Sequence, residues 1–434
     1  MKNARQTAFD ILNKIQRDDS YSNILLDSVL DKSELSAIDK SFASALVYGV
    51  VERKITLDFE LSQYLTQPLK KLKPQVLTAL RLGAYQILFM DKVPDSAAIN
   101  ESVKLAKTNG AAFASGLVNA VLRKISSAGL TETDDLSIRF SAPLWLCALW
   151  TDAYGRENTI KILESSFGSV ETTIRVNSLK TDLKSLTEAL NDINISACPS
   201  VVDNALIVRN AGAIHKTKEY SDGMFHVQDV ASQLCCKALE VHEHDTVFDI
   251  CSAPGGKSFT LAQNMNNTGK LYAFDIHQHR LNLINEGAER LGITNIITQI
   301  NDGSVFNSDL PKADKILCDV PCAGLGVIRK KPEIRYKDSA DIDNLPDLQY
   351  SILCVSSQYL KHGGTLVYST CSLNPEENEN VINRFLNEHK NFEPVRVLPE
   401  LPRFSEDTDY ITLMPHIHNC DGFFISAVTK IKDV

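Results

Sequence analysis

The 434-residue sequence lacks several features that would mark a secreted, membrane or zinc-binding protein. No apolar run is long enough to span a bilayer, and the N-terminal segment has no apolar core of the kind that signal peptides carry. No C-x-x-C pair occurs, and all ten cysteines follow Arg139. We therefore expect a cytoplasmic protein with reduced thiols and no structural zinc site, long enough to form two or three domains.

Positive charge is not in excess either. The chain has 45 lysines and arginines against 54 aspartates and glutamates, which gives a formal net charge of −9. A protein that binds nucleic acid through bulk charge alone would be basic. Any contact with nucleic acid must therefore depend on local basic clusters.

One short segment could supply metal ligands. His416, His418 and Cys420 alternate along a stretch that we expect to be a strand, so their side chains would share one face. No fourth ligand is in view, whereas structural zinc sites use four. We expect no metal.

The first 140 residues are expected to form an all-α domain. Apolar residues recur at helical spacing over residues 1–127, and Ser36 with Asp39 forms a capping-box pattern at one helix start. Prolines fall between the periodic segments, where they end helices: Pro68, Pro74 and Pro94. We expect a bundle that binds a partner or supports its neighbour, because no pattern in it carries chemistry.

The rest of the chain divides near residue 222. Residues 141–222 indicate a linker helix followed by a small α+β unit, with strands over Thr172–Asn177 and Ala205–Val208. Over residues 223–434 strands and helices alternate, which is the pattern of an α/β domain with a parallel sheet.

Two strands of this last domain end at cysteine-bearing turns. Ile316–Cys318 runs into Asp319-Val320-Pro321-Cys322, and Thr365–Tyr368 runs into Ser369-Thr370-Cys371. A single cysteine is most often simply buried. Catalytic groups, however, collect at the carboxyl ends of parallel strands. We therefore expect Cys322 and Cys371 to face one site, and Cys318, inside its apolar run, to belong to the core.

A glycine-bearing turn follows the first strand of the same domain. Gly255 and Gly256 remove side chains, which lets backbone N–H groups approach a ligand at a helix start. The turn ends in Gly-Lys-Ser, but a phosphate-binding P-loop requires glycine where Cys251 stands, and G-x-G-x-x-G is absent. A nucleotide triphosphatase or a dehydrogenase is therefore disfavoured.

Acidic residues close the next two strands. Asp275, 19 residues after Gly256, is in the position from which a carboxylate accepts ribose hydroxyls, and Asp302 could reach an adenine edge. Carboxylates at strand ends after a glycine turn favour an adenosine-type cofactor. Because no phosphate loop is present, we expect S-adenosylmethionine.

These groups together suit the methylation of a pyrimidine. C5 of a pyrimidine is a poor nucleophile until a thiolate adds to C6. A second thiol or a base could then assist loss of the C5 proton and release of the thiolate. Asp319 could hydrogen-bond N3 and N4, which would favour cytosine. The target base must be unpaired or extruded to be reached.

A basic run lies just past Cys322 in the sequence. In isolation such a run is usually a solvated loop. Beside a nucleobase site, contacts with RNA phosphates are the better interpretation. The candidate residues are Arg329, Lys330, Lys331 and Arg335, to which we add Arg175 of the α+β unit.

The motifs that carry this chemistry resemble those of the Nol1/Nop2/Sun family of cytosine-C5 RNA methyltransferases, which use two cysteines. The long pieces are CSAPGGK (251–257), DVPCAGLGVIRKKPEIR (319–335) and STCSLNPEENE (369–379). Shorter ones are RVN (175–177), FHVQDVASQL (225–234) and DGFF (421–424). The front domain resembles the NusB-like module, whose fusion to this core is typical of bacterial enzymes that act on 16S rRNA.

The resemblance implies a fold and a set of roles. The fold would be a NusB-like all-α bundle, a small α+β RNA-binding unit and a class I (Rossmann-like) methyltransferase domain with a seven-stranded sheet. Cys371 would be the nucleophile, Cys322 would help release the product, Asp319 would contact the cytosine and Lys257 would orient that carboxylate. The cofactor would be held by Cys251, Ser252, Ala253, Pro254, Gly255, Gly256, Lys257, Asp275, Asp302 and Asp319. The partner would be 16S rRNA, and the protein a monomer.

Three alternatives stay open. A DNA cytosine-C5 methyltransferase also carries a Pro-Cys pair, but there that cysteine is the nucleophile, and the turn Ser369-Thr370-Cys371 favours RNA. Another RNA, such as a tRNA or 23S rRNA, could be the substrate. A non-catalytic RNA-binding protein is disfavoured, because the acidic and cysteine positions are intact.

Overall fold

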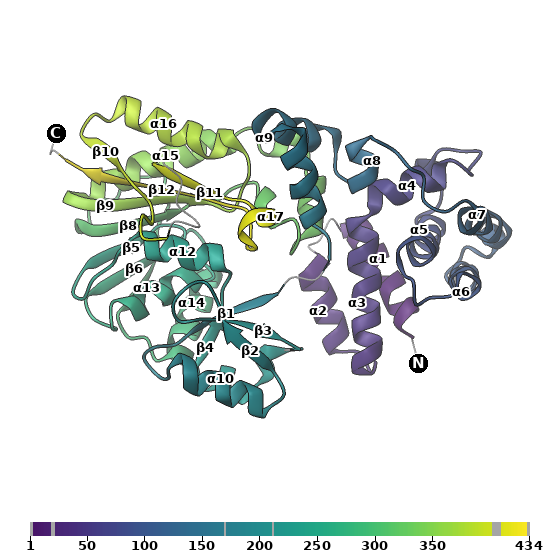
Figure 1. The fold of residues 1–434 in the computed structure, drawn as a ribbon, viewed down its shortest axis with the longest axis horizontal. Helices are drawn as coiled ribbons and strands as arrows, with labels where there is room; N and C mark the ends of the chain where they lie inside the picture. The colour runs from purple at the N-terminus through teal and green to yellow at the C-terminus, as the bar shows by residue number, and fades with distance from the viewer. Residues whose placement is uncertain (1–2, 19–21, 169–170, 211, 402–408, 432–434) are drawn as a thin grey trace. The chain divides into compact units, whose positions relative to one another are not determined.

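The chain forms two compact units in its computed structural model, which describes residues 3–18, 22–168, 171–210, 212–401 and 409–431. The first unit combines residues 1–167 with residues 328–337, and the second combines residues 168–327 with residues 338–434. Figure 1 follows the chain by colour through both units. The expected boundary at residue 140 differs from this division, because helix α9 (Leu144–Ser165) groups with the first unit.

The first unit is helical over its described residues. Its helices pack around a core that includes Phe9, Leu46, Leu80 and Leu122. Their bounds are α1 Ala4–Asp18, α2 Ser22–Asp31, α3 Ala37–Glu52, α4 Lys54–Ser62, α5 Pro74–Phe89, α6 Asp95–Thr108, α7 Ser115–Ala128, α8 Leu136–Phe140 and α9. None of the helices in the described part of the chain is long and apolar enough to cross a bilayer.

The expected cap at Ser36 and the expected position of prolines between helices are confirmed in this unit. The hydroxyl of Ser36 accepts a hydrogen bond from the N–H of Asp39 at 3.2 Å, which caps α3. Pro74 is the first residue of α5, and Pro94 immediately precedes α6. Proline is tolerated there because the first N–H groups of a helix have no intrahelical partner.

A short segment that is distant in sequence completes the helical unit. Residues 328–337 include the 3₁₀ helix Pro332–Tyr336, and Arg335 within it is 0% exposed. Its guanidinium donates to the carbonyl of Phe140 and to the hydroxyl of Ser166, both at 3.2 Å. The Tyr336 hydroxyl donates to the carbonyl of Val51 at 2.8 Å. The chain therefore leaves the second unit after residue 327 and returns to it at residue 338.

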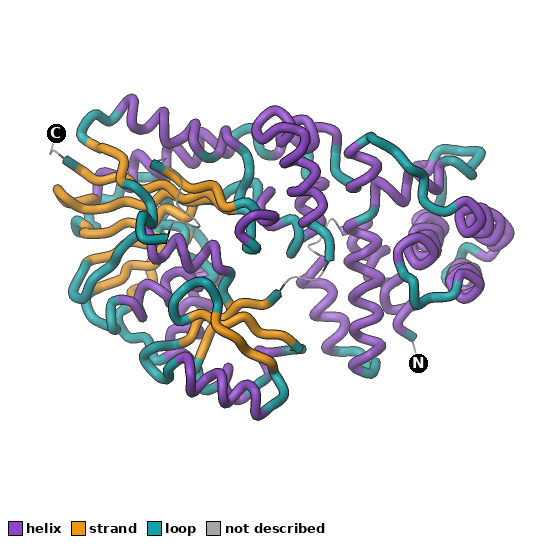
Figure 2. The backbone as a smooth tube through the Cα atoms, viewed as in Figure 1, coloured by secondary structure: helices purple, strands orange, loops and turns teal. Residues whose placement is uncertain are grey.

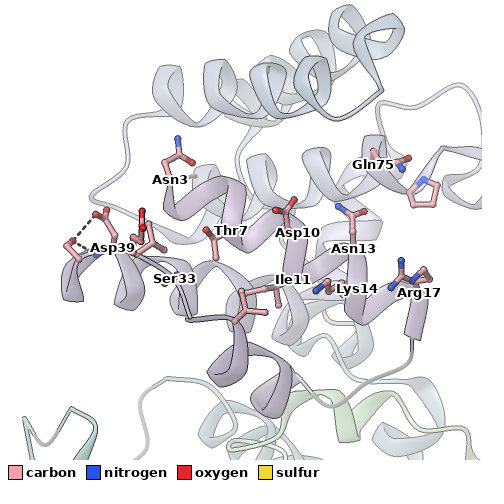
Figure 3. Close-up of a pocket in the computed structure, with 15 residues that line it drawn as sticks. Asn3, Thr7, Asp10, Ile11, Asn13, Lys14, Arg17, Ser33, Asp39 and Gln75 are labelled. Carbon is pink, nitrogen blue, oxygen red and sulfur yellow. Dashed lines mark hydrogen bonds between the residues drawn. The ribbon is translucent and has the colours of Figure 1, made fainter. Parts of the chain in front are cut away.

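The helical unit also contains a cavity of about 910 Å³. Figure 3 shows its polar lining, in which Thr7, Asp10, Lys14 and Arg17 come from α1 and Asp39 from α3. Cations and carboxylates are mixed along it, and no cysteine or histidine is among its lining residues. Its size alone does not make it an active site, and we assign it no chemistry.

The second unit begins with a four-stranded antiparallel sheet of order β2-β3-β1-β4. Its strands are β1 Thr172–Val176, β2 Ser196–Pro199, β3 Ala205–Arg209 and β4 Phe225–Val227. One face packs Ile174, Leu206 and Phe225 against Leu186 and Leu190 of α10 (Leu183–Asp192). The short helix α11 (Lys218–Ser221) precedes β4. The small α+β unit expected from the sequence is therefore present.

An eight-stranded sheet forms the rest of this unit, with order β10-β12-β9-β8-β5-β6-β7 and β11 paired to β12. Figure 2 draws its strands in orange. The strands are β5 Thr246–Asp249, β6 Lys270–Asp275, β7 Ile296–Ile300, β8 Ala313–Asp319, β9 Leu360–Thr370, β10 Phe392–Val395, β11 Tyr410–Leu413 and β12 Phe423–Lys430. The five strands from β9 to β7 are parallel, whereas β12 is antiparallel to its three neighbours. The expected seven-stranded path is present, and β11 adds an eighth strand.

Helices cover both faces of this sheet. Side chains of α12 (Val230–Ala238), α13 (Gly256–Asn264) and α14 (Gln278–Leu291) pack with Val247 and Leu317 on one face. Side chains of α15 (Leu345–Tyr359) and α16 (Glu379–Glu388) pack with Phe248 and Cys318 on the other face, and the short α17 spans Pro415–His418. Cys318 is fully buried, so its assignment to the core is confirmed.

Replacing Arg335 with alanine should destabilise the helical unit by about 2–4 kcal/mol, because the buried acceptors around it lose their donors and a void remains. The exposed neighbour Lys331 provides a matched control, and Lys331→Ala should change the free energy of unfolding by less than about 0.5 kcal/mol. Thermal melts followed by circular dichroism measure both variants. Equal shifts for the two would contradict the anchoring role of Arg335.

Candidate active site

The two predicted cysteines meet at the carboxyl ends of neighbouring strands. β8 and β9 are parallel, and Asp319 pairs in register with Ser369. Cys322 follows the first strand end and Cys371 the second, and their sulfur atoms are 3.2 Å apart. The N–H of Gly326 donates to the carbonyl of Cys371 at 2.9 Å, which folds one turn onto the other. The expectation that the two cysteines face one site is confirmed.

The surroundings of the two sulfur atoms make them unequal. The hydrogen bond with Cys322 lowers the pKa of Cys371 below its usual value, and the Lys257 ammonium lowers it further against burial and the carboxylate of Asp319. The same hydrogen bond raises the pKa of Cys322 well above its usual value, and burial and the carboxylates of Glu377 and Asp319 add to this. These directions favour Cys371 over Cys322 as the sulfur that ionises first.

Lys257 connects the cysteine pair to the glycine turn. Its ammonium donates to Asp319 Oδ2 at 2.8 Å, and Asp319 Oδ1 accepts from the Ser369 hydroxyl at 2.9 Å. Burial disfavours the charged amine, but the Asp319 carboxylate outweighs it and raises the pKa of Lys257 above its usual value. Both oxygens of Asp319 are thus fixed. The expected contact between Lys257 and this carboxylate is confirmed.

The glycine turn lies between β5 and α13. Gly255 has a φ of +106°, and a side chain there would overlap the ring of Phe259, so glycine is required. Ser252 is buried and donates to the carbonyl of Phe274 at 2.8 Å, which ties the turn to β6. The turn opens onto a cavity of about 230 Å³ whose lining includes Cys251, Ser252, Ala253, Pro254, Gly256 and Lys257.

Asp249 also lines this cavity, and the sequence interpretation missed it. It is fully buried at the end of β5, and its Oδ2 accepts from the hydroxyl of Ser258 at 2.6 Å. Burial raises the pKa of Asp249 to about 7, although the Ser258 hydrogen bond opposes the shift. Its Oδ1 is buried without a hydrogen-bond partner among the described residues. A buried acceptor of this kind is costly unless a ligand donates to it.

The two other predicted carboxylates lie at the ends of β6 and β7. Asp275 is buried, with Oδ1 accepting from the N–H of His277 and Oδ2 paired with Arg280, both at 2.9 Å. Arg280 also donates to the carbonyl of Ala253 at 3.0 Å, so it links Asp275 to the glycine turn. Asp302 is exposed, and hydrogen bonds from Ser304 lower its pKa. Neither carboxylate is among the residues that line the cavity of about 230 Å³.

The predicted RNA-contacting cations do not form one group. Arg175 is buried, and its guanidinium donates to the Asp203 carbonyl at 2.7 Å and to Asn264 at 2.9 Å. Arg335 is enclosed in the helical unit, as described above. Neither guanidinium can reach a phosphate, and the prediction for these two residues is corrected. Solvent reaches the others, of which Arg329 and Lys330 are partly exposed and Lys331 is exposed.

The histidine–cysteine segment differs from its expected form. His416 and His418 lie on α17 and not on a strand. The Nδ1 atom of His418 accepts from the N–H of Met414 at 2.8 Å. Over the described ranges, no group of three or more histidine, cysteine, aspartate or glutamate side chains is arranged to hold a metal ion.

The geometry can be compared with known proteins. Matching family models are 16S rRNA methyltransferase RsmB/F over residues 236–429, the NusB family over residues 2–127 and the RsmF/B-like ferredoxin-like domain over residues 142–215. The chain is 38% identical to a probable ribosomal RNA small subunit methyltransferase B of Bacillus subtilis, with 98% of each chain covered. It is 34% identical to the human 28S rRNA (cytosine(4447)-C(5))-methyltransferase over 69% of this chain and 39% of that protein.

A solved structure matches over the same length. The crystal structure of PH0851 superposes with a TM-score of 0.85, at 25% identity and over 99% of both chains. The NusB-like, α+β and methyltransferase parts implied by the sequence motifs are therefore confirmed. A relative at 38% identity over nearly the full length, joined to these domain matches, shows that the chain belongs to the ribosomal RNA small subunit methyltransferase B family.

Proposed function

We propose that this protein methylates C5 of a cytosine in 16S rRNA with S-adenosylmethionine as the methyl donor. The observation that carries the proposal is the cysteine pair, in which two sulfur atoms 3.2 Å apart differ in their affinity for a proton. The names of the relatives support the substrate, since one acts on small-subunit rRNA and another on cytosine C5. The sequence resemblance implies cytosine 967 in rRNA numbering.

The residues around the glycine turn fit the cofactor. Asp249 Oδ1 is a buried acceptor without a partner among the described residues, and it lines the cavity into which the turn opens. The ammonium of an amino acid moiety is a donor that would satisfy it. Asp275 lies at the end of the next strand, where a carboxylate accepts ribose hydroxyls, and the exposed Ile276 after it offers an apolar surface to adenine. S-adenosylmethionine supplies an electrophilic methyl group when it is bound.

The two cysteines have different roles in the reaction with the cytosine base. The Cys371 thiolate adds to C6 of the cytosine, which makes C5 nucleophilic toward the methyl group. After methyl transfer the C5 proton leaves to a base, and the C6–S bond breaks so that the electron pair returns to the Cys371 sulfur. The Cys322 thiol stabilises that departing thiolate by donating a hydrogen bond to it.

Asp319 and Lys257 select and hold the base. The Asp319 carboxylate, fixed by Lys257 and Ser369, accepts from the N4 amino group of cytosine, which uracil lacks. Lys257 pairs with this carboxylate and adds positive potential beside the Cys371 sulfur. Of the predicted cations, Arg329, Lys330 and Lys331 remain candidates for phosphate contacts.

A Cys322→Ala variant should trap the covalent adduct. Without the thiol that stabilises the departing sulfur, release should slow by at least about a hundredfold. Incubation with 16S rRNA and S-adenosylmethionine, followed by a denaturing gel, should show a shifted protein–RNA band. The band should vanish in the double variant that also carries Cys371→Ala. Absence of the band, with the cofactor bound and the wild type active, would refute these cysteine roles.

The raised pKa of Asp249 predicts a pH-dependent difference in stability between the wild type and Asp249→Asn. Because its folded pKa of about 7 lies above the unfolded value near 3.8, the folded state holds a proton that is lost as pH rises toward 7. This cost is absent only well below pH 3.8 and is complete above pH 7. Asp249→Asn removes it, so the cofactor-free variant should melt higher than wild type at pH 8, and the difference should shrink steadily as pH falls from 7 toward 3.8.

The same variant tests the cofactor contact. Asp249→Asn removes the carboxylate charge that would pair with an ammonium, so S-adenosylmethionine binding at pH 8 should weaken by about tenfold or more in titration calorimetry. The exposed Asp309→Asn is the control for both measurements. A stability difference that stays constant with pH, or unchanged cofactor affinity, would exclude the assigned role.

A further inference from the structure

One buried carboxylate joins the two cysteine turns, and the mechanism above assigns it no part. Glu377 is 0% exposed, at the end of the 3₁₀ helix Pro375–Glu377. Its Oε2 accepts from the N–H of Ala323 at 2.7 Å, and its Oε1 accepts from the hydroxyl of Ser372 at 2.6 Å. Ala323 follows Cys322 directly, and Ser372 follows Cys371 directly. A single side chain therefore holds the residue next to each sulfur-bearing residue.

Further hydrogen bonds complete the connection. Gln349 on α15 donates both to Glu377 Oε2 at 3.0 Å and to the carbonyl of Pro321 at 2.9 Å, so the turn is held on both sides of Cys322. Asn374 donates to Glu377 Oε1 at 3.3 Å. Each carboxylate oxygen thus has two donors, which compensates the desolvation of a buried charge.

The next residue holds the other side of the second turn. Asn378 accepts from the hydroxyl of Thr370 at 2.6 Å and donates to the carbonyl of Ser372 at 3.0 Å. The residues before and after Cys371 are therefore both fixed by the segment that contains Glu377. Small shifts of either turn would lengthen the 3.2 Å separation between the sulfur atoms, and hydrogen bonds weaken steeply with such changes.

Charge around the sulfur pair is arranged asymmetrically. The titratable groups that face the pair are Lys257 from α13, Asp319 from β8, Asp421 from the loop before β12, and Glu377. Lys257 acts on Cys371, whereas Glu377 acts on Cys322. A carboxylate beside a thiol disfavours its thiolate, so Glu377 adds to the raised pKa of Cys322.

We propose that Glu377 is a positioning residue that locks the two cysteine turns together and thereby sets the geometry and charge around the sulfur pair. It contacts neither base nor cofactor in this assignment and acts through the backbone and charge of the two turns. The inference deepens the proposed function, and its importance for methyl transfer rests on that function. The chemistry of the sulfur pair can, however, be measured without RNA or cofactor.

The test is alkylation of the free protein by iodoacetamide across pH 6–10, with each cysteine quantified by peptide mass spectrometry. In the wild type Cys371 should react ahead of Cys322, because the thiolate is the nucleophile. In Glu377→Gln the charge is lost and an amide NH₂ faces groups that need an acceptor. The ratio of Cys371 to Cys322 labelling at pH 8 should fall by about tenfold, which corresponds to about one pKa unit.

Glu376→Gln is the matched control, since Glu376 is the exposed neighbour in the same motif, and its labelling ratio should equal that of the wild type. A Glu377→Gln protein that binds S-adenosylmethionine and melts normally, yet keeps the wild-type ratio and pH profile, would overturn the proposal. If Glu377→Gln does not fold, Ser372→Ala decides, because it removes one donor and leaves three. A smaller change in the same direction supports the proposal, and an unchanged ratio rejects it.

The proposed function can fail separately. If wild-type protein does not methylate 16S rRNA while the labelling ratio follows Glu377 as expected, the substrate assignment is wrong and the positioning role stands. If methylation proceeds and the Cys371-to-Cys322 labelling ratio does not change in Glu377→Gln, the substrate assignment stands and the positioning role is wrong. If the substrate assignment and the positioning role are both correct, Glu377→Gln should lower the rate of methyl transfer by at least about tenfold, and Glu376→Gln should not.

Discussion

The parallel pairing of β8 with β5 on one side and β9 on the other is the constraint on which the site depends. From β5 the chain proceeds outward through β6 and β7 on one side, and then through β8 and β9 on the other. The strand order reverses at that point, which leaves a crevice at the carboxyl ends. Asp249, Asp319 and Cys371 lie at or just past the ends of these three strands. Asp319 and Ser369, 50 residues apart, are thereby brought within hydrogen-bond range.

Burial gives the charges at this crevice their effect. Lys257 is the cation that pairs with Asp319, and Asp249 lines the same cavity. In a medium of low dielectric constant each charge acts strongly on its neighbours. The same burial that raises the pKa of Asp249 makes Lys257 effective in stabilising a thiolate at Cys371. A site exposed to water would distinguish the two cysteines far less.

The helical unit shows that a run of basic residues in the sequence need not be exposed to solvent. Arg335 follows Arg329, Lys330 and Lys331 in sequence, but it is enclosed by helices from the front of the chain. Its planar guanidinium satisfies carbonyl and hydroxyl acceptors that no aliphatic side chain could satisfy. The segment 328–337 begins six residues after Cys322 in the sequence, although it groups with the helical unit.

The sequence by itself determined what depends on local pattern. Helical periodicity and proline positions predicted the bundle, strand–turn spacing predicted the glycine turn, and the polar ends of two apolar runs predicted that Cys322 and Cys371 would meet. Asp249 and Glu377 were missed, because a carboxylate at a strand end or in a turn has no local mark of burial. Arg175 and Arg335 were wrongly predicted to contact RNA for the same reason. Only the tertiary structure decides such cases, since burial and hydrogen-bond partners come from residues far away in the chain, and those partners fix whether a charge faces solvent, a ligand or the protein interior.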